Sequence, residues 1–195
     1  MGLKIGITGG IGAGKSIICN IFKVLGVPVY NADQEAKDIM HKNAYVRESL
    51  KNAFGSEVYR ESGELDRKFL SAQVFSNEER LRVLNEIVHP AVIRDAEEWA
   101  EEQQFAYSLK EAALLFESGS YAKLDFTILV TAPEHIRISR VVERDQVTPQ
   151  QVKERISKQM EDEQKIALAD FVILNDGKEA LLPQVLKLHN YFLTL

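Results

Sequence analysis

Short apolar runs alternate with amphipathic stretches along the chain. Residues 3–8 (LKIGIT) are typical of a short strand, and residues 15–25 (KSIICNIFKVL) carry apolar side chains at the spacing of a helix with one buried face. Gly26 is a suitable helix stop, and residues 27–32 (VPVYNA) predict a second strand, in which Pro28 is tolerated near the start. This order predicts an α/β fold with a mainly parallel sheet.

The pattern changes in the middle of the chain and then returns to strands. Residues 33–104 are highly charged and predicted to be helical, with a turn at residues 61–63. Residues 77–104 form one long helix or two, because Pro90 removes a backbone donor and disfavours helix at His89. We interpret this region as a helical insertion packed on the sheet. Further strands are expected at residues 105–109, 125–131 and 170–174, and helices at residues 133–167 and 178–192.

The composition is that of an ordinary folded protein. Of the 195 residues, 45% are hydrophobic, and 24 Lys and Arg against 29 Asp and Glu give a net charge of −5. This apolar content argues against disorder, and no window approaches the ~20 apolar residues of a transmembrane helix. The N-terminal residues lack the features of a secretory signal, so we expect a cytoplasmic protein with no membrane partner.

Charge and cysteine content narrow the possible partners. A mildly acidic chain is unsuited to coating nucleic acid through bulk charge, whereas a small anionic ligand is compatible with it. The single cysteine, Cys19, excludes an intramolecular disulfide framework and a cysteine-based zinc site, and we expect it to be a small buried apolar residue. His41, His135 and His189 are isolated and show no metal-ligand spacing. We expect no nucleic-acid partner, and a monomer or a small homo-oligomer.

The most specific motif is a glycine-rich loop at residues 9–16. Its sequence, GGIGAGKS, satisfies G-x-x-x-x-G-K-[ST] between a predicted strand and a predicted helix, which disfavours a turn without a ligand. Glycines let the backbone curl with positive φ, so that N–H groups and the helix N-terminus face a bound phosphate. Lys15 supplies a charge to the β- and γ-phosphates, and Ser16 a hydroxyl ligand for Mg²⁺. Ile17 and Ile18 are expected to be buried in the helix.

Several classes of protein contain such a phosphate loop. A GTPase would show a later N-K-x-D motif, which the chain lacks; the nearest sequence is Asn175-Asp176-Gly177. Motor and AAA-type ATPases generally need a longer chain. A small-molecule kinase is therefore favoured, and a nucleotide-dependent switch or binding module is the alternative from a different class.

Two carboxylates follow predicted strands, at the edge of a parallel sheet where ligands bind. Asp33 comes directly after the second strand, where it could orient an acceptor hydroxyl and take its proton. Alternatively, Asp33 caps a helix that begins near Gln34. Glu111 closes the third strand, where it could contact Mg²⁺ directly or through water, or could be a solvated charge.

An arginine-rich segment resembles the lid of small-molecule kinases. Arg137, Arg140 and Arg144 lie three and four residues apart, and therefore on one helical face, from which they could close over ATP. The turn at Thr148-Pro149 predicts a helix–turn–helix hairpin, which suits a moving lid. The alternative is a solvated face whose arginines pair with Glu134, Glu143 and Glu154.

Together these residues resemble the dephospho-coenzyme A kinase family. The matching segments run through the whole chain in order, and several of them are more specific than the phosphate loop alone. They are ITGGIGAGKS at residues 7–16, NAD at 31–33, LDR at 65–67, HP at 89–90, LLFE at 114–117, RVVERD at 140–145, RISKQM at 155–160 and ADFVILNDG at 169–177.

The resemblance implies a reaction and a fold. The reaction is transfer of the ATP γ-phosphoryl group to the ribose 3′-hydroxyl of dephospho-coenzyme A, with Mg²⁺ as cofactor. The fold is a single P-loop kinase domain, residues 1–195, with a five-stranded parallel sheet flanked by helices. Its expected subregions are a nucleotide core (about 1–33, 105–135 and 166–195), an acceptor-binding insertion (about 34–104) and a lid (about 136–165).

The resemblance also implies roles for individual residues. Asp33 is the base or hydroxyl-orienting group, and Lys15 and Arg140 act on the phosphates. The implied ATP-binding residues are Gly12, Ala13, Gly14, Lys15, Ser16, Ile17, Arg144, Asn175 and Gly177. The implied acceptor-binding residues are Asp33, Arg67, His89, Leu114, Leu115, Phe116 and Glu117. The expected Mg²⁺ ligands come from the phosphate-loop motif and the strand position instead: Ser16 directly, and Glu111 directly or through water.

Other interpretations of these residues remain open. His89 could be a buried, hydrogen-bonded turn histidine, Arg67 could form a surface pair with Asp66, and Trp99 is expected to serve packing. Two positions depart from the family pattern. Asn31 stands where an aspartate is usual, and Ala113 where a proline is usual before LLFE.

Overall fold

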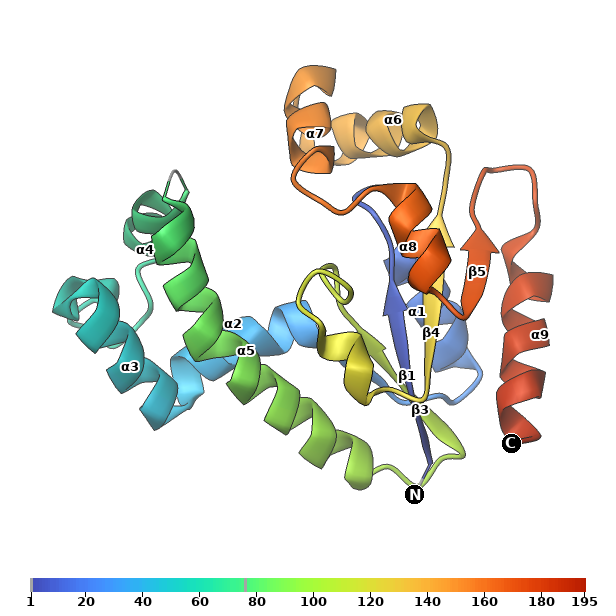
Figure 1. The fold of residues 1–195 in the computed structure, drawn as a ribbon, viewed down its shortest axis with the longest axis horizontal. Helices are drawn as coiled ribbons and strands as arrows, with labels where there is room; N and C mark the ends of the chain where they lie inside the picture. The colour runs from blue at the N-terminus through green and yellow to red at the C-terminus, as the bar shows by residue number, and fades with distance from the viewer. Residues whose placement is uncertain (1, 76) are drawn as a thin grey trace. The chain divides into compact units, whose positions relative to one another are not determined.

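The structure, a computed structural model, describes residues 2–75 and 77–195. The chain divides into two compact units (Figure 1). The first comprises Met1–Asn31 with Trp99–Leu195, and the second comprises Ala32–Glu98. None of the helices in the described part of the chain is both long and apolar enough to span a membrane.

A five-stranded parallel sheet forms the centre of the first unit. The strand order is β2-β3-β1-β4-β5, and every neighbouring pair is parallel. The predicted α/β fold with a parallel sheet flanked by helices is therefore confirmed. The strands are β1 Leu3–Thr8, β2 Val29–Asn31, β3 Tyr107–Glu111, β4 Phe126–Thr131 and β5 Phe171–Leu174.

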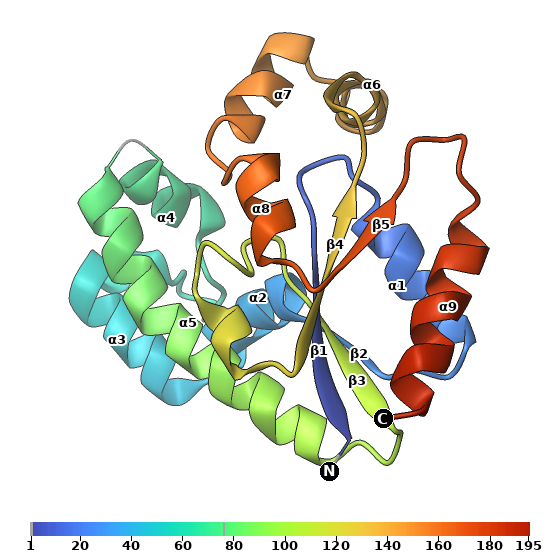
Figure 2. The same cartoon turned by 45° about the vertical axis from the view of Figure 1, so that its right-hand side comes forward.

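Helices cover both faces of this sheet. In Figures 1 and 2, α1 and α9 lie side by side against one face, and α8 lies against the other. The predicted hairpin in the 133–167 region is confirmed as α6 and α7, which stand beyond the carboxyl end of β4. The helices are α1 Lys15–Val24, α6 Glu134–Asp145, α7 Pro149–Ile156, α8 Asp162–Leu168, α9 Leu181–Leu193 and a 3₁₀ turn, η2, at Ser120–Lys123.

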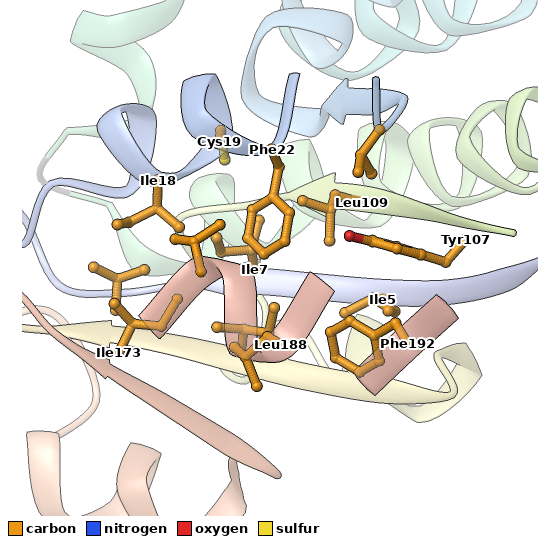
Figure 3. Packing of buried hydrophobic residues seen from close by; sticks show 14 of the residues in the cluster. Ile5, Ile7, Ile18, Cys19, Phe22, Tyr107, Leu109, Ile173, Leu188 and Phe192 are labelled. Atoms are coloured by element: carbon orange, nitrogen blue, oxygen red, sulfur yellow. The ribbon is translucent and has the colours of Figure 1, made fainter. Parts of the chain in front are cut away.

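The main hydrophobic core lies between the sheet and α1 with α9 (Figure 3). Side chains alternate along β1, so Ile5 and Ile7 face this core, whereas a Cβ on Gly6 would meet Leu115 and Leu124 on the other face. Each fully buried aliphatic or aromatic side chain stabilises the fold by about 1.5–3 kcal/mol. This core fixes the first turn of α1 beside the carboxyl end of β1. It includes Ile18, Cys19, Phe22, Tyr107, Leu109, Ile173, Leu188 and Phe192.

Two strands differ in extent from their predictions. The second strand is only Val29–Asn31, because Ala32 already begins a helix. The third strand runs over Tyr107–Glu111 instead of residues 105–109. The polar end of this strand pairs with β1, where Lys110 lies opposite Gly6. Phe105 precedes the strand, and its ring packs edge-on to the Tyr107 ring.

The second unit is helical. Its predicted turn is confirmed: Gly63 has φ 84°, and Tyr59 and Leu65 form an isolated antiparallel bridge around it. The Tyr59 hydroxyl donates to the Met40 carbonyl oxygen at 2.6 Å, and the Arg47 guanidinium lies 4.2 Å from the centre of the Tyr59 ring. The helices are α2 Ala32–Lys42, α3 Ala44–Phe54, α4 Arg67–Val74 and α5 Glu78–Glu101, with a 3₁₀ turn, η1, at Ser56–Val58.

The segment with Pro90 is one helix and not two. α5 continues through Pro90, whose side chain is exposed. Val88, Ala91 and Val92 are buried on either side of the proline, so tertiary packing outweighs its local cost to the helix.

Candidate active site

The glycine-rich loop joins β1 to α1 and is tightly curled. Gly12 and Gly14 have φ of 78° and 94°, the positive values expected of this loop. The Lys15 ammonium donates to the Gly9 carbonyl oxygen at 2.8 Å, and the Ala13 N–H donates to the Gly10 carbonyl oxygen at 3.0 Å. The loop is therefore held in its curled shape by hydrogen bonds of its own.

Helix α6 packs directly against this loop. A Cβ on Gly12 would lie 2.5 Å from the backbone oxygen of Arg137, so only glycine permits this approach. One turn further along α6, the Arg140 guanidinium donates to the Gly12 carbonyl oxygen at 3.4 Å. The same side chain donates to the backbone oxygen and to Oδ1 of Asn175, both at 3.1 Å.

Asn175 links this helix to the loop from a third segment. It is buried, and its Nδ2 donates to the Ala13 carbonyl oxygen at 2.8 Å. Its own N–H donates to the Thr131 carbonyl oxygen at 2.8 Å, which fixes it at the end of β5. Gly177 follows in the same turn with φ 80°. Three segments of the predicted ATP site are thus connected by hydrogen bonds.

The three arginines of α6 have three different settings. Arg137 is buried, and its Nη2 lies 2.6 Å from Asp162 Oδ2. Arg144 is exposed and pairs with Asp145 at 2.7 Å, which holds the pKa of that carboxyl below its usual range. Arg137 is thus held by Asp162 while Arg144 lies at the surface, and closure of these arginines over ATP stays a prediction. The predicted solvated face is wrong in its partners: among the described residues, the acids that pair with these arginines are Asp145 and Asp162.

Ile17 and Ile18 also differ from each other in burial. Ile18 is buried as expected, but Ile17 is 54% exposed. The predicted burial of Ile17 is wrong, because its side chain points away from the sheet in the first turn of α1. Ile18 and the buried Cys19 supply the contact with the core.

Glu111 is not a solvated charge. It is only 8% exposed at the end of β3, and its Oε2 accepts a hydrogen bond from Asn31 Nδ2 at 3.2 Å. Burial and the neighbouring Glu111 carboxylate raise the pKa of the Cys19 thiol above its usual range. Cys19 lies three residues after Ser16, so both share one side of α1. Glu111 thus lies beside the helix side that carries Ser16.

This arrangement fits Mg²⁺ in its donor chemistry. Hydroxyl and carboxylate oxygens are hard ligands, and Mg²⁺ in phosphoryl-transfer sites uses one or two protein ligands together with substrate phosphates. In the described part of the chain, no group of three or more His, Cys, Asp or Glu side chains is placed to hold a metal. Ser16 and Glu111 suit an ion that the phosphates help to bind.

The segment Leu114 to Glu117 presents two of its four side chains to solvent. Leu115 and Phe116 are buried, main chain included, whereas Leu114 is exposed. Glu117 Oε1 accepts the Met160 N–H at 3.2 Å and lies 3.2 Å from Lys165 Nζ.

Two contacts of this region have no signal in the local sequence. Lys165 is completely buried, yet it lies in a charged helix where a lysine is normally exposed. The Gln159 side chain binds the Ile11 N–H of the phosphate loop, 148 residues away in the chain. No local pattern reveals contacts of this kind, although Gln159 lies within a segment matched to the family.

The remaining predicted residues lie in the second unit. Asp33 is exposed and is the second residue of α2, so the alternative that it caps a helix starting near Gln34 is wrong. Arg67 is the exposed first residue of α4. His89 is half-buried inside α5, so it is not a turn histidine. Trp99, in the first unit, packs as expected, 5.4 Å from the Tyr30 ring.

Asp66 is not the partner of Arg67. Its Oδ1 caps α4 by accepting the N–H groups of Lys68 and Phe69, and its Oδ2 lies 3.2 Å from Arg60. The Phe69 N–H and then the Arg60 guanidinium lower the pKa of the Asp66 carboxyl. The predicted surface pair with Arg67 is therefore wrong.

Comparison with known proteins identifies the family. The family model described as dephospho-CoA kinase matches residues 3–180. The chain belongs to the dephospho-CoA kinase family. A dephospho-CoA kinase of Salinibacter ruber is 42% identical over 176 residues, which cover 89% of this chain and 88% of that protein.

Solved structures agree with this membership. TT1252 from Thermus thermophilus has a TM-score of 0.86 and 35% identity, with 97% of both chains covered. A dephospho-CoA kinase from Campylobacter jejuni has a TM-score of 0.71 and 28% identity, with 97% of this chain and 96% of that chain covered. The predicted P-loop kinase fold, ATP-dependent kinase class and dephospho-CoA kinase function are confirmed.

Proposed function

We propose that this chain uses the site described above to transfer the γ-phosphoryl group of ATP to the 3′-hydroxyl of dephospho-CoA. The observation that carries this proposal is the network in which Arg140 and Asn175 bind the main chain of the phosphate loop. This network connects the phosphate loop, helix α6 and the turn after β5. Cytoplasmic location and oligomeric state stay predictions.

ATP binds along the segments that this network connects. Its phosphates lie on the loop N–H groups of Gly12 to Ser16 and at the N-terminus of α1, and Ile17 is exposed beside them. Lys15 and Arg140 stabilise the charge of the transferred phosphoryl group. Arg144, which is exposed, adds a charge after leaving Asp145, and the turn with Asn175 and Gly177 borders the adenine.

The Ser16 hydroxyl would hold Mg²⁺ directly, and the Glu111 carboxylate would act through water. When bound, the ion would neutralise charge on the phosphates. The Asn31 amide supports this role by fixing one Glu111 oxygen. An asparagine at position 31 donates this hydrogen bond, which an ionised aspartate could not do.

Asp33 orients the acceptor hydroxyl and takes its proton. Asn31, the last residue of β2, pairs with Glu111 at the carboxyl edge of the sheet, and two further residues span at most about 7 Å of chain. The 3′-oxygen forms a bond to the γ-phosphorus, the bond from that phosphorus to the β–γ bridging oxygen breaks, and ADP leaves. The hydroxyl proton moves to the Asp33 carboxylate.

The residues assigned to the acceptor by the family resemblance are Arg67 and His89 in the helical unit and Leu114 to Glu117 in the first unit. Arg67 is exposed at the start of α4 and carries a charge suited to the acceptor's phosphates. His89 contributes from α5. Leu114 and Glu117 contribute side chains, whereas the buried Leu115 and Phe116 shape the segment that carries them.

Substitution of Asp33 tests this proposal. Asp33→Asn should lower kcat by about 10²–10⁴-fold, because the proton acceptor is lost, and should leave ATP affinity unchanged. Turnover is measured as ADP release, ATP affinity by calorimetry, and the 3′-phosphorylated product by ³¹P NMR. Glu35→Gln, in the same first turn of α2, is the matched control and should retain activity.

Three results would contradict the proposal. Wild-type turnover in Asp33→Asn would remove the base or orienting role. ADP release with other alcohols, nucleosides or nucleotides but not with dephospho-CoA would change the acceptor. Slow hydrolysis without any phosphorylated product would instead indicate a nucleotide-dependent switch.

A further inference from the structure

The segment between α7 and α8 binds the phosphate loop from outside the predicted ATP contacts. Gln159 Oε1 accepts the Ile11 N–H at 3.0 Å. Only the amide oxygen can accept this hydrogen bond, so the orientation of the Gln159 amide is fixed. Ile11 is the third residue of the glycine-rich loop and precedes the curled part at Gly12.

Arg137 occupies the space next to this hydrogen bond. A Cβ at Gly10 would overlap the Arg137 guanidinium and would lie 3.6 Å from Gln159 Oε1. Asp162, three residues after Gln159, holds the same guanidinium at 2.6 Å. A side chain at the second position of the loop would therefore displace the Arg137 guanidinium, which Asp162 holds in place.

The same segment also reaches the predicted acceptor loop. The Met160 N–H donates to Glu117 Oε1 at 3.2 Å, and the buried Lys165 pairs with that carboxylate. Residues 159–165 thus contact the phosphate loop, helix α6 and the Leu114 to Glu117 segment, all within the first unit.

We propose that Gln159 is a positioning residue for the phosphate loop. It gives the Ile11 N–H an acceptor when no nucleotide is bound, and so keeps the loop in the curled conformation that receives phosphate. A preformed loop loses less conformational freedom on binding, which raises affinity for ATP. The inference rests on the proposed function, since it assumes that ATP binds at this loop.

Gln159→Leu tests the inference, because it removes the acceptor and keeps a side chain of similar size. One hydrogen bond to the main chain corresponds to about a three- to tenfold change in equilibrium. We expect the Kd for ATP, measured by calorimetry, to rise by that factor, and kcat at saturating ATP to stay within about twofold. Gln164→Leu, at an exposed position in α8, is the matched control and should bind ATP like the wild type.

Hydrogen exchange gives a readout that does not depend on catalysis. In the nucleotide-free protein, Gln159→Leu should speed amide exchange in residues 9–17, and Gln164→Leu should not. If Gln159→Leu does not fold, Gln159→Met, which retains the unbranched side chain, takes its place. Equal ATP affinity and equal exchange in both variants would overturn the positioning role, whereas a wild type that binds no ATP would overturn the proposed function instead.

Discussion

Lys165 is completely buried in α8, and its ammonium group lies 3.2 Å from Glu117 Oε1. Within the described residues, its Nζ makes no hydrogen bond, so the ion pair is what compensates the burial of this charge. Glu117 is in a different position, because its side chain is 20% exposed and it also accepts the Met160 N–H. The two partners should therefore respond unequally to substitution.

Glu117→Gln should destabilise the fold by about 3 kcal/mol, because it leaves a buried ammonium group without an anion. Lys165→Met removes the buried charge and leaves Glu117 with water and the Met160 N–H, so its cost should stay within about 1 kcal/mol. Urea unfolding of the two single variants and of the double variant measures these values. The double variant should resemble Lys165→Met.

The reverse order would contradict this account. If Lys165→Met were the more destabilising substitution, the Lys165 charge would stabilise the fold by more than its burial costs. If all three variants matched the wild type, the ion pair would have no part in stability.

Individual residues show what the sequence could reveal about the site. The phosphate loop was predictable because all its residues are adjacent in the chain and because its curled backbone needs positive φ, which glycine allows. The different environments of Arg137 and Arg140 could not be predicted, because both residues lie on α6 and differ only in their partners. Arg137 pairs with Asp162, and Arg140 binds Asn175. Asn175 itself was predicted from a family segment.

At the scale of elements, β5 is an edge strand that is fixed at both ends. At its start, Asp170 Oδ2 accepts the N–H and the hydroxyl hydrogen of Thr127, both at 2.8 Å, and the Asp170 N–H donates back to the Thr127 hydroxyl oxygen at 3.1 Å. At its end, the Asn175 N–H binds the Thr131 carbonyl oxygen. The strand thus holds Asn175 where Arg140 and the phosphate loop meet it.

Asp170→Ala should loosen the start of β5. The loss of two hydrogen bonds to a carboxylate should lower the free energy of unfolding by about 2 kcal/mol. It should also weaken ATP binding modestly, because Asn175 lies at the other end of a strand of four residues. Urea unfolding and calorimetry measure the two effects.

Asp170→Asn is the matched control for this strand. Its Oδ1 can still accept the Thr127 donors, so most of the stability should remain. An alanine variant as stable as the wild type would show that pairing with β4 alone fixes β5.

Some helices and strands can be predicted from local sequence alone, and others cannot. β1 and α1 follow from an apolar run, glycines and a helical apolar spacing, and the structure has them at Leu3–Thr8 and Lys15–Val24. The continuation of α5 through Pro90 depends on burial of Val88, Ala91 and Val92, which proline chemistry does not predict. The extension of β3 to Glu111 depends on a partner strand that is far away in the sequence.

At the scale of the whole molecule, the residues proposed to bind ATP and those proposed to bind the acceptor are distributed differently over the two units. All proposed ATP contacts, from Gly12 to Gly177, lie in the unit formed by Met1–Asn31 and Trp99–Leu195. The proposed acceptor contacts are divided, since Asp33, Arg67 and His89 belong to Ala32–Glu98 and Glu117 does not. Ligands that stabilise different units should be distinguishable by where they slow hydrogen exchange.

ATP with Mg²⁺ should therefore slow amide exchange in residues 9–18, 134–145 and 174–178 and leave residues 44–58 unchanged. Dephospho-CoA should slow exchange in residues 64–74 and 112–118, because its proposed contacts include Arg67 and the segment ending at Glu117. The measurement is hydrogen exchange followed by mass spectrometry, with each substrate alone and with both. It needs no turnover, so it reports binding separately from catalysis.

Lys15→Ala is the control, because it removes the charge that binds the β- and γ-phosphates and should abolish the ATP effect while leaving the dephospho-CoA effect intact. Protection of residues 44–58 by ATP alone would mean that nucleotide binding stabilises both units together. Protection by dephospho-CoA confined to the first unit would mean that Arg67 and His89 do not bind the acceptor. The acceptor site would then consist of Leu114 to Glu117 without Arg67 and His89, and the helical unit would have a different role.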